Sequence, residues 1–227
     1  MKKFIKFLIF DLIIVLISFI YFLRMTKTVD VEWTPDDYES GITKTKVEVS
    51  DINYLNIENI LNDNLLYYGE NRVQNSFSNK EVSAILSSAN DTTGPISNIK
   101  VKFLANNEVE ANFILKKSTV DFLKQTAEKD PNAGKYVAVL DVVVDTPMYI
   151  KGKLNSYDDY TIDATIESIY LGNIQLGEDT LEKVQTSIVP FINLMILKYK
   201  GLSIEQLNIK QDMLEFIGTL PSIIDKK

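Results

Sequence analysis

The chain has 227 residues, of which 45% are hydrophobic and 24% are charged, and it contains neither cysteine nor histidine. This composition is typical of a folded globular protein and excludes a disordered or collagen-like chain. The two missing residue types exclude disulfide frameworks, thiol nucleophiles, Ser-His-Asp triads and histidine zinc sites.

The net charge of −7 is divided unevenly along the chain. Residues 1–27 carry a net charge of +4, so the remaining 200 residues carry −11. Only two of the 24 basic residues are arginines, Arg24 and Arg72. Because clustered cations supply most of the affinity for nucleic acids, we expect no nucleic-acid partner.

The first predicted element is a membrane helix over Phe4–Leu23. This segment contains only two charged side chains, Lys6 and Asp11, and a helix of this length spans about 30 Å, the thickness of a bilayer core. A cleaved signal peptide is the alternative, but no Ala-x-Ala pattern follows the apolar run. The N-terminal lysines favour a cytoplasmic N-terminus. We therefore predict residues 1–24 to be a cytoplasmic tip and single-pass signal anchor in the cell membrane, with an extracellular C-terminal domain.

The next segment is polar and acidic and shows little periodicity. We predict a linker over residues 25–41 and one folded domain over residues 42–227. A helix is predicted over Asp51–Tyr68, where apolar residues recur at helical spacing. A second helix is predicted to begin after Ser78, because Ser78 and Glu81 form the S-x-x-E pattern of a capping box.

The apolar period then changes from 3.6 to 2, which indicates strands. Alternation on both sides of Asn106-Asn107 predicts a β-hairpin over residues 99–115, since asparagine tolerates the positive φ of tight turns. A short helix is predicted from Ser118 to Ala127. Three further strands are predicted over Tyr136–Asp145, Met148–Leu154 and Tyr160–Leu171.

Glu178–Lys198 is the strongest predicted helix of the folded domain. Its second half is apolar on nearly every side, so we expect it to be buried. A last hairpin is predicted from Leu202–Ile209 and Asp212–Phe216. The predicted fold class is α+β: an N-terminal transmembrane helix followed by a bent antiparallel sheet wrapped around a long apolar helix.

The sequence was searched for patterns typical of catalytic, phosphate-binding and metal sites, and none indicates such a site. Ser97-Asn98-Ile99-Lys100 matches the S-x-x-K acyl-enzyme pattern, but it opens a predicted strand, where residues i and i+3 point to opposite faces. The nine glycines are dispersed, so no phosphate-binding loop is present. Asp158-Asp159 is typical of a turn rather than of a calcium loop. We therefore predict that the protein is not an enzyme and has no catalytic residues, metal site or cofactor.

The passage Ile166–Leu176, IESIYLGNIQL, precedes the long apolar helix. It resembles the strand–Leu-Gly–strand–helix passage of the YpmS-like family of membrane-anchored Gram-positive proteins, and the order of the predicted elements is similar as well. That family is related in appearance to tubular lipid-binding domains, in which a strongly bent sheet wraps a long helix and shelters lipid chains. The resemblance implies such a fold and implies no catalytic residues.

A sheet curled around an apolar helix can leave a groove suited to acyl chains, or the helix can fill a closed core. We expect the protein to bind lipid or another envelope amphiphile. The alternative is a protein–protein interaction module of a cell-envelope or sporulation complex. The candidate groove residues lie on the Leu-Gly passage and along one stripe of the long helix: Leu171, Ile174, Leu181, Val184, Ile188, Phe191, Ile192 and Met195.

Overall fold

In the computed structural model the described residues are 27–51, 54–55, 59–60, 62–91, 94, 96–118, 120–121 and 144–227. The predicted membrane segment Phe4–Leu23 lies outside them. The predicted helix Ser118–Ala127 and the predicted strand Tyr136–Asp145 lie largely outside them.

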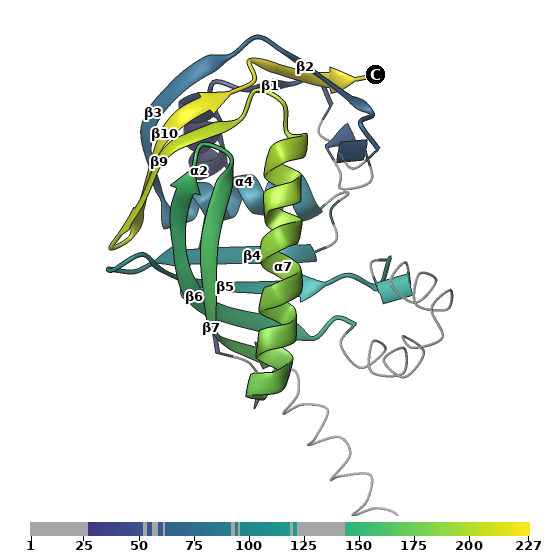
Figure 1. The fold of residues 1–227 in the computed structure, drawn as a ribbon, viewed down its shortest axis with the longest axis vertical. Coiled ribbons are helices and arrows are strands. Elements are labelled where there is room, and N and C mark those ends of the chain that lie inside the picture. The colour runs from purple at the N-terminus through teal and green to yellow at the C-terminus, as the bar shows by residue number, and fades with distance from the viewer. Residues whose placement is uncertain are drawn as a thin grey trace, which may run out of the picture.

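Strands dominate the described part of the chain, which contains eleven strands in three sheets and three helices (Figure 1). The largest sheet is antiparallel, and its strands, in spatial order, are β4 (Ile96–Phe103), β5 (Glu108–Leu115), β6 (Pro147–Asp158), β7 (Thr161–Leu171) and β8 (Ile174–Gln175). A second sheet contains β3 (Asn71–Ser78), β10 (Met213–Leu220) and β9 (Ser203–Lys210). The third contains β1 (Glu48–Val49), β11 (Ile223–Lys226) and β2 (Leu65–Tyr68), with β1 and β11 parallel.

The three helices are α2 (Pro35–Thr45), α4 (Asn79–Asp91) and α7 (Glu178–Lys198). Figure 1 shows α7 crossing one side of the largest sheet, while α4 lies between that sheet and the second one. The bounds of α7 are those predicted from the sequence, and the predicted capping box of α4 is confirmed. The Ser78 amide donates to Glu81 Oε2 over 2.8 Å, and the Glu81 amide donates to Ser78 Oγ over 3.2 Å.

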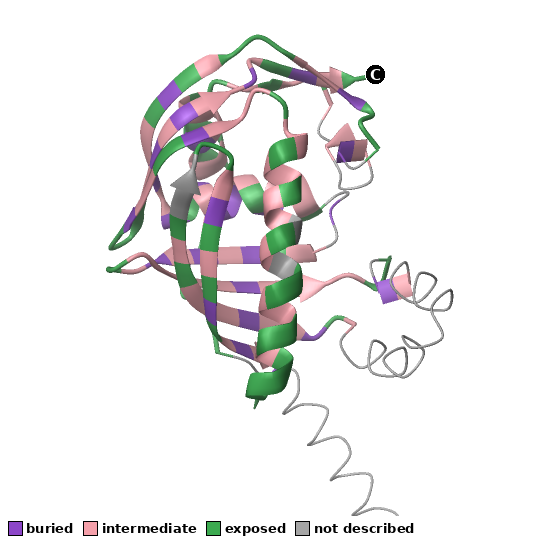
Figure 2. Cartoon of the chain, viewed as in Figure 1, coloured by how far each residue is buried: buried purple, intermediate pink, exposed green. Residues whose placement is uncertain are grey.

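The predicted fold class is wrong in its central feature, because no sheet wraps around a long apolar helix in the described structure. α7 lies against β7 on one side, and its opposite side faces solvent (Figure 2). Leu194 is 44% exposed and Leu197 is 60% exposed, so the apolar second half of α7 is not enclosed. The strands divide into three sheets, which leaves no single sheet long enough to close around the helix.

The predicted membrane anchor also requires correction. Within the described ranges, no helix is long and apolar enough to cross a membrane. The longest of them, α7, begins with Glu178 and Asp179 and continues with Glu182 and Lys183, and charges at this density are costly inside a bilayer. The structure therefore does not support the predicted single-pass localisation with an extracellular C-terminal domain.

Residues 27–45, which overlap the predicted linker, pack on the domain. The side chain of Asn112, on β5, accepts a hydrogen bond from the Val29 amide and donates to the Lys27 carbonyl over 2.7 Å. Val29 and Val31 are buried against Tyr149. Helix α2 follows at once, because Thr34 caps it and Pro35 has no amide hydrogen to leave unpaired.

The two predicted hairpins, whose strands are close in sequence, are confirmed. β4 and β5 form the expected hairpin, with Asn106 and Asn107 at φ 62° and 61°. The late hairpin forms as β9 and β10, and Asp212 takes a positive φ at its turn.

Side chains of α4 cover the outer edge of β4 in a regular series. The Phe103 amide donates to Asn79 Oδ1 over 2.7 Å, and the Val101 amide donates to Ser83 Oγ over 2.8 Å. Ser87 Oγ, one further turn along α4, donates to the Ile99 carbonyl over 2.8 Å. Asn79, Ser83 and Ser87 are four residues apart and lie on one face of α4. Their side chains take the place of a neighbouring strand, because they pair with backbone groups at the edge of β4.

Replacing Ser83 by alanine tests this edge pairing. Ser83 is fully buried, so the substitution leaves the Val101 amide without its partner and away from water. We expect a loss of about 1–3 kcal/mol in the free energy of unfolding, measured by urea denaturation. Ser88→Ala, on the same helix, is the matched control and should change stability by less than about 0.5 kcal/mol. Equal effects of the two substitutions would show that the Val101 amide finds another partner.

Candidate functional site

The five-stranded sheet has one apolar face and one polar face. The register places Ala111 opposite Ile150 and Ile150 opposite Ile169, and it aligns Phe113, Met148 and Leu171 in the next row. Since directly paired residues point to the same side of a sheet, these side chains share one surface. We call it the apolar face, and it comprises Val101, Phe103, Ala111, Phe113, Met148, Ile150, Ile166, Ile169 and Leu171.

The polar face carries a charged network across β5, β6 and β7. Lys151 Nζ lies 2.8 Å from Glu108 Oε2 and 3.8 Å from Glu167 Oε2, and Lys153 Nζ lies 3.6 Å from Glu167 Oε1. The hydrogen bond from Lys151 holds the pKa of Glu108 below its ordinary value. Opposite charges paired across neighbouring strands in this way stabilise a sheet.

The apolar face is covered at its two sides and less so in its middle. Val101 and Phe103, next to α4, are 6% and 3% exposed, and Ile169, on β7, is 1% exposed. Between them, on β5 and β6, the side chains are only half-buried: Ala111, Phe113, Met148 and Ile150. Ala111 and Phe113 pack against the cluster of Ile99, Val101, Phe103 and Ile209, yet part of the apolar surface of the four half-buried side chains stays accessible to solvent.

Helix α7 is attached to the outer edge of β7 by two amide side chains. Asn193 Oδ1 accepts from the Ile162 amide over 2.9 Å, and Asn193 Nδ2 donates to the Ile162 carbonyl over 3.1 Å. Gln185 Oε1 accepts from the Ile166 amide over 3.2 Å. Strand β8 pairs only with Tyr170 and Leu171. Side chains of α7 therefore supply the hydrogen-bond partners of Ile162 and Ile166 farther along this edge of β7. The sequence signal for this arrangement was two amides eight residues apart on an otherwise apolar stripe.

The predicted groove residues that the structure describes separate into three groups. Leu171, Leu181 and Val184 are half-buried, Leu171 on the apolar face and the other two on the first half of α7. Ile192 packs against the core cluster of Val73, Phe77, Ile162, Ile204 and Phe216, and Met195 packs against the cluster of Ile60, Leu65 and Ile224.

The remaining predicted groove residues are Ile174, Ile188 and Phe191. Ile174 is 40% exposed on β8. Ile188 and Phe191 lie on α7, and their side chains are outside the described part. The sequence missed the contributions of β5 and β6, whose alternation predicted strands but not which rows of side chains would remain uncovered.

Two shallow pockets occur elsewhere on the described surface. One, of about 510 Å³, lies between β7 and the first turns of α7 and is lined by Glu167, Glu178, Asp179, Leu181, Glu182, Gln185 and Thr186. Among the described residues, no cluster of three or more acidic side chains is arranged to hold a metal ion. The other, of about 520 Å³, lies at the turns that follow β2 and α7 and is lined by Tyr67, Gly69, Glu70, Lys200 and Gly201.

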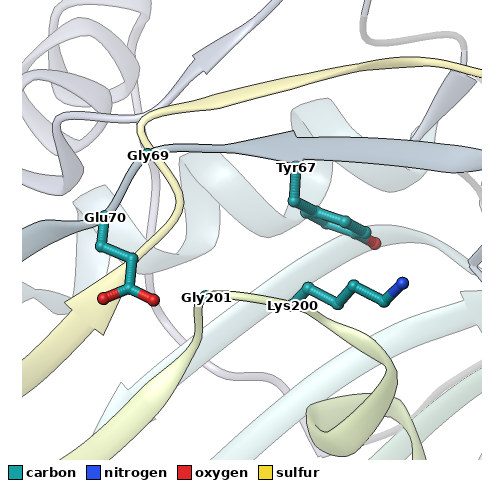
Figure 3. A pocket seen from close by; sticks show the side chains of 5 residues that line it. All are labelled: Tyr67, Gly69, Glu70, Lys200 and Gly201. Carbon is teal, nitrogen blue, oxygen red and sulfur yellow. The ribbon is translucent and has the colours of Figure 1, made fainter.

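The second of these pockets is lined by one tyrosine, one acidic and one basic side chain. Figure 3 shows Tyr67 and Lys200 extending to the same side, with Glu70 pointing away from them. Burial and the nearby Asp63 carboxylate raise the pKa of Tyr67 to about 12, so its hydroxyl is neutral at pH 7. That hydroxyl is buried and has no hydrogen-bond partner among the described residues, and the ring of Tyr199 lies 5.2 Å from that of Tyr67.

The apolar face beneath α7 is therefore the strongest candidate site in the described structure. The resemblance to the YpmS-like family stays a prediction. No family model, curated protein or solved structure matches the chain.

Proposed function

We propose that this protein binds an amphiphile with a long alkyl chain on the apolar face beneath α7, and that it does so without catalysis. The observation that carries the proposal is the row of half-buried side chains on β5 and β6, Phe113, Met148 and Ile150 among them. This row lies between the buried side chains of β4 and those of Ile166 and Ile169 on β7. An alkyl chain laid on this row would remove the remaining apolar surface from water.

The shape of the site favours a chain over a compact ligand. From Leu181 to Met195, α7 runs for about 21 Å, and the apolar face continues beside it across three strands. Burial of a methylene group contributes about 0.8 kcal/mol, or roughly a fourfold change in Kd. Affinity should therefore increase with chain length as long as the added carbons remain on the apolar surface.

The binding of alkyl maltosides below their critical micelle concentrations tests the proposal. We expect the full chain to bind dodecyl maltoside more tightly than decyl maltoside, and decyl more tightly than octyl, with roughly a fourfold change in Kd per methylene. Isothermal titration calorimetry and native mass spectrometry measure the two quantities needed, affinity and stoichiometry. Absence of binding by dodecyl maltoside, or affinity independent of chain length, would contradict the proposal.

A pair of substitutions tests which face of the five-stranded sheet binds the ligand. Ile150→Glu puts a carboxylate on the apolar face, which we expect to weaken dodecyl maltoside binding at least tenfold because that charge must stay hydrated. Thr165→Glu puts the same side chain on the polar face, opposite Lys153, and should leave Kd unchanged. Ile150→Ala provides a milder variant that removes contact area without adding a charge.

A protein–protein interaction module remains the second candidate. It is favoured by Leu194 and Leu197, which project from the solvent side of α7 and are 44% and 60% exposed. An empty protein that binds none of the alkyl maltosides would leave this candidate in place.

A further inference from the structure

We propose that the first half of α7, Glu178–Gln185, is a lid over the apolar face that opens by bending at Pro190 while the second half of the helix stays in place. What the lid admits depends on the proposed function, but the motion itself does not. Three observations on separate parts of α7 support it.

The second half of α7 is firmly anchored. Ile192 and Ile196 pack into the core cluster built around Val73 and Phe77. Asn193 holds both backbone groups of Ile162. This half of the helix therefore cannot leave the domain without disrupting its core.

The first half has much weaker attachment. Most of its residues are exposed, and Leu181, Val184 and Gln185 are only half-buried. Among the described contacts, its one hydrogen bond to the sheet is the 3.2 Å bond between Gln185 and the Ile166 amide. At its start, the N-cap residue Gly177 makes no side-chain cap, and a Cβ built there would meet no atom within 4 Å.

The two halves meet at a weakened point in the helix. Pro190 has no amide hydrogen, so it cannot donate to the Thr186 carbonyl, which the regular helix would require. The hydroxyls of Thr186 and Ser187 both donate to the Lys183 carbonyl, over 3.0 and 2.9 Å. Serine and threonine hydroxyls bonded in this way bend helices. The weakened point therefore lies between the anchored half and the weakly attached half.

Among the described contacts, opening the lid breaks one hydrogen bond to the sheet, that of Gln185, and its main cost is the exposure of apolar surface that includes the buried side chains of Ile166 and Ile169 on β7. It would expose Leu181 and Val184 together with the β7 side of the apolar face. A bound alkyl chain would cover the same surfaces again when the lid closes. The lid thus gives an alkyl chain a lateral entrance that requires no rearrangement of the sheet.

Hydrogen exchange on the full chain without ligand tests the motion. We expect the amides of residues 182–186 to exchange at least tenfold faster than those of residues 193–197. Pro190→Ala restores the missing helical hydrogen bond and should slow exchange at 182–186 about tenfold. Pro35→Ala, at the first position of α2, is the matched control and should leave exchange in α7 unchanged.

Fraying from the N-terminus of α7 would also give fast exchange in its first half, but it would not respond to residue 190. Equal exchange in the two halves, or no effect of Pro190→Ala, would overturn the lid. The lid further predicts that Pro190→Ala slows the release of dodecyl maltoside several-fold in stopped-flow experiments. If exchange behaves as expected but no alkyl maltoside binds, the lid is supported and the proposed ligand is wrong.

Discussion

Replacement of Gly218 by alanine is expected to destabilise the protein by about 3 kcal/mol, since it forces atoms into a closed space between two strands. Gly218 lies on β10 where its pairing with β9 shifts register. A Cβ at this position would lie 2.0 Å from the Ser203 carbonyl oxygen and 2.8 Å from Phe216 Cζ. The backbone of β9 would have to move away, which would disturb the core cluster that contains Ile204 and Phe216.

Thermal unfolding followed by circular dichroism measures this effect. The control is Gly177→Ala, because a Cβ there meets nothing within 4 Å; since alanine is a poorer N-cap than glycine, we expect a loss of about 0.5–1 kcal/mol, well below that of Gly218→Ala. A Gly218→Ala protein that melts at the parent temperature would show that β9 and β10 are not packed as closely as described.

Replacement of Glu81 by alanine is expected to cost about 2–3 kcal/mol, because it removes the buried acceptor of a polar network. The Glu81 side chain is 7% exposed and lies 2.7 Å from Lys44 Nζ. It also accepts hydrogen bonds from the Ser40 hydroxyl and the Ser78 amide. We expect less than the full effect of breaking a buried ion pair, because the Lys44 side chain is 35% exposed and can be rehydrated.

The same carboxylate makes stability depend on pH. Burial alone would raise the pKa of Glu81, but hydrogen bonds from Lys44, Ser40 and Ser78 lower it below the ordinary value of 4.5. A lowered pKa in the folded state contributes stability that is complete above the unfolded-state value and is lost as the pH falls through the folded-state value. The difference in unfolding free energy between the parent and Glu81→Gln should therefore shrink below pH 4.5. Glu70→Gln, an exposed carboxylate, is the control.

Local signals in the sequence predicted much of the secondary structure. The capping box at Ser78 and the turn at Asn106-Asn107 each act within a few residues, so the sequence contains all the information that they need. The bounds of α7 were predictable for the same reason. By contrast, Leu65–Tyr68 was predicted as the end of a helix and forms β2, whose partner β11 lies at residues 223–226.

The candidate site was predictable only in part. The stripe on α7 identified Leu181 and Val184, but periodicity could not show that the helix would lie on one side of a sheet with its other side in water. Nor could it show that Met148 and Ile150 would remain half-covered, since that depends on which elements reach the middle of the sheet. Tertiary packing sets both features.

The pairing of the sheets has a consequence for synthesis. β3 pairs with β10, and both β1 and β2 pair with β11, so two of the three sheets cannot be completed until residues 213–226 have left the ribosome. About 135 residues separate the end of β3 from the start of β10, which at ribosomal speed is a delay on the order of 10 s. During this time, β3 has no partner strand, whereas the β4–β5 hairpin can already form. The nascent chain therefore carries an unpaired strand that is open to chaperones and to other chains until β10 has been synthesised.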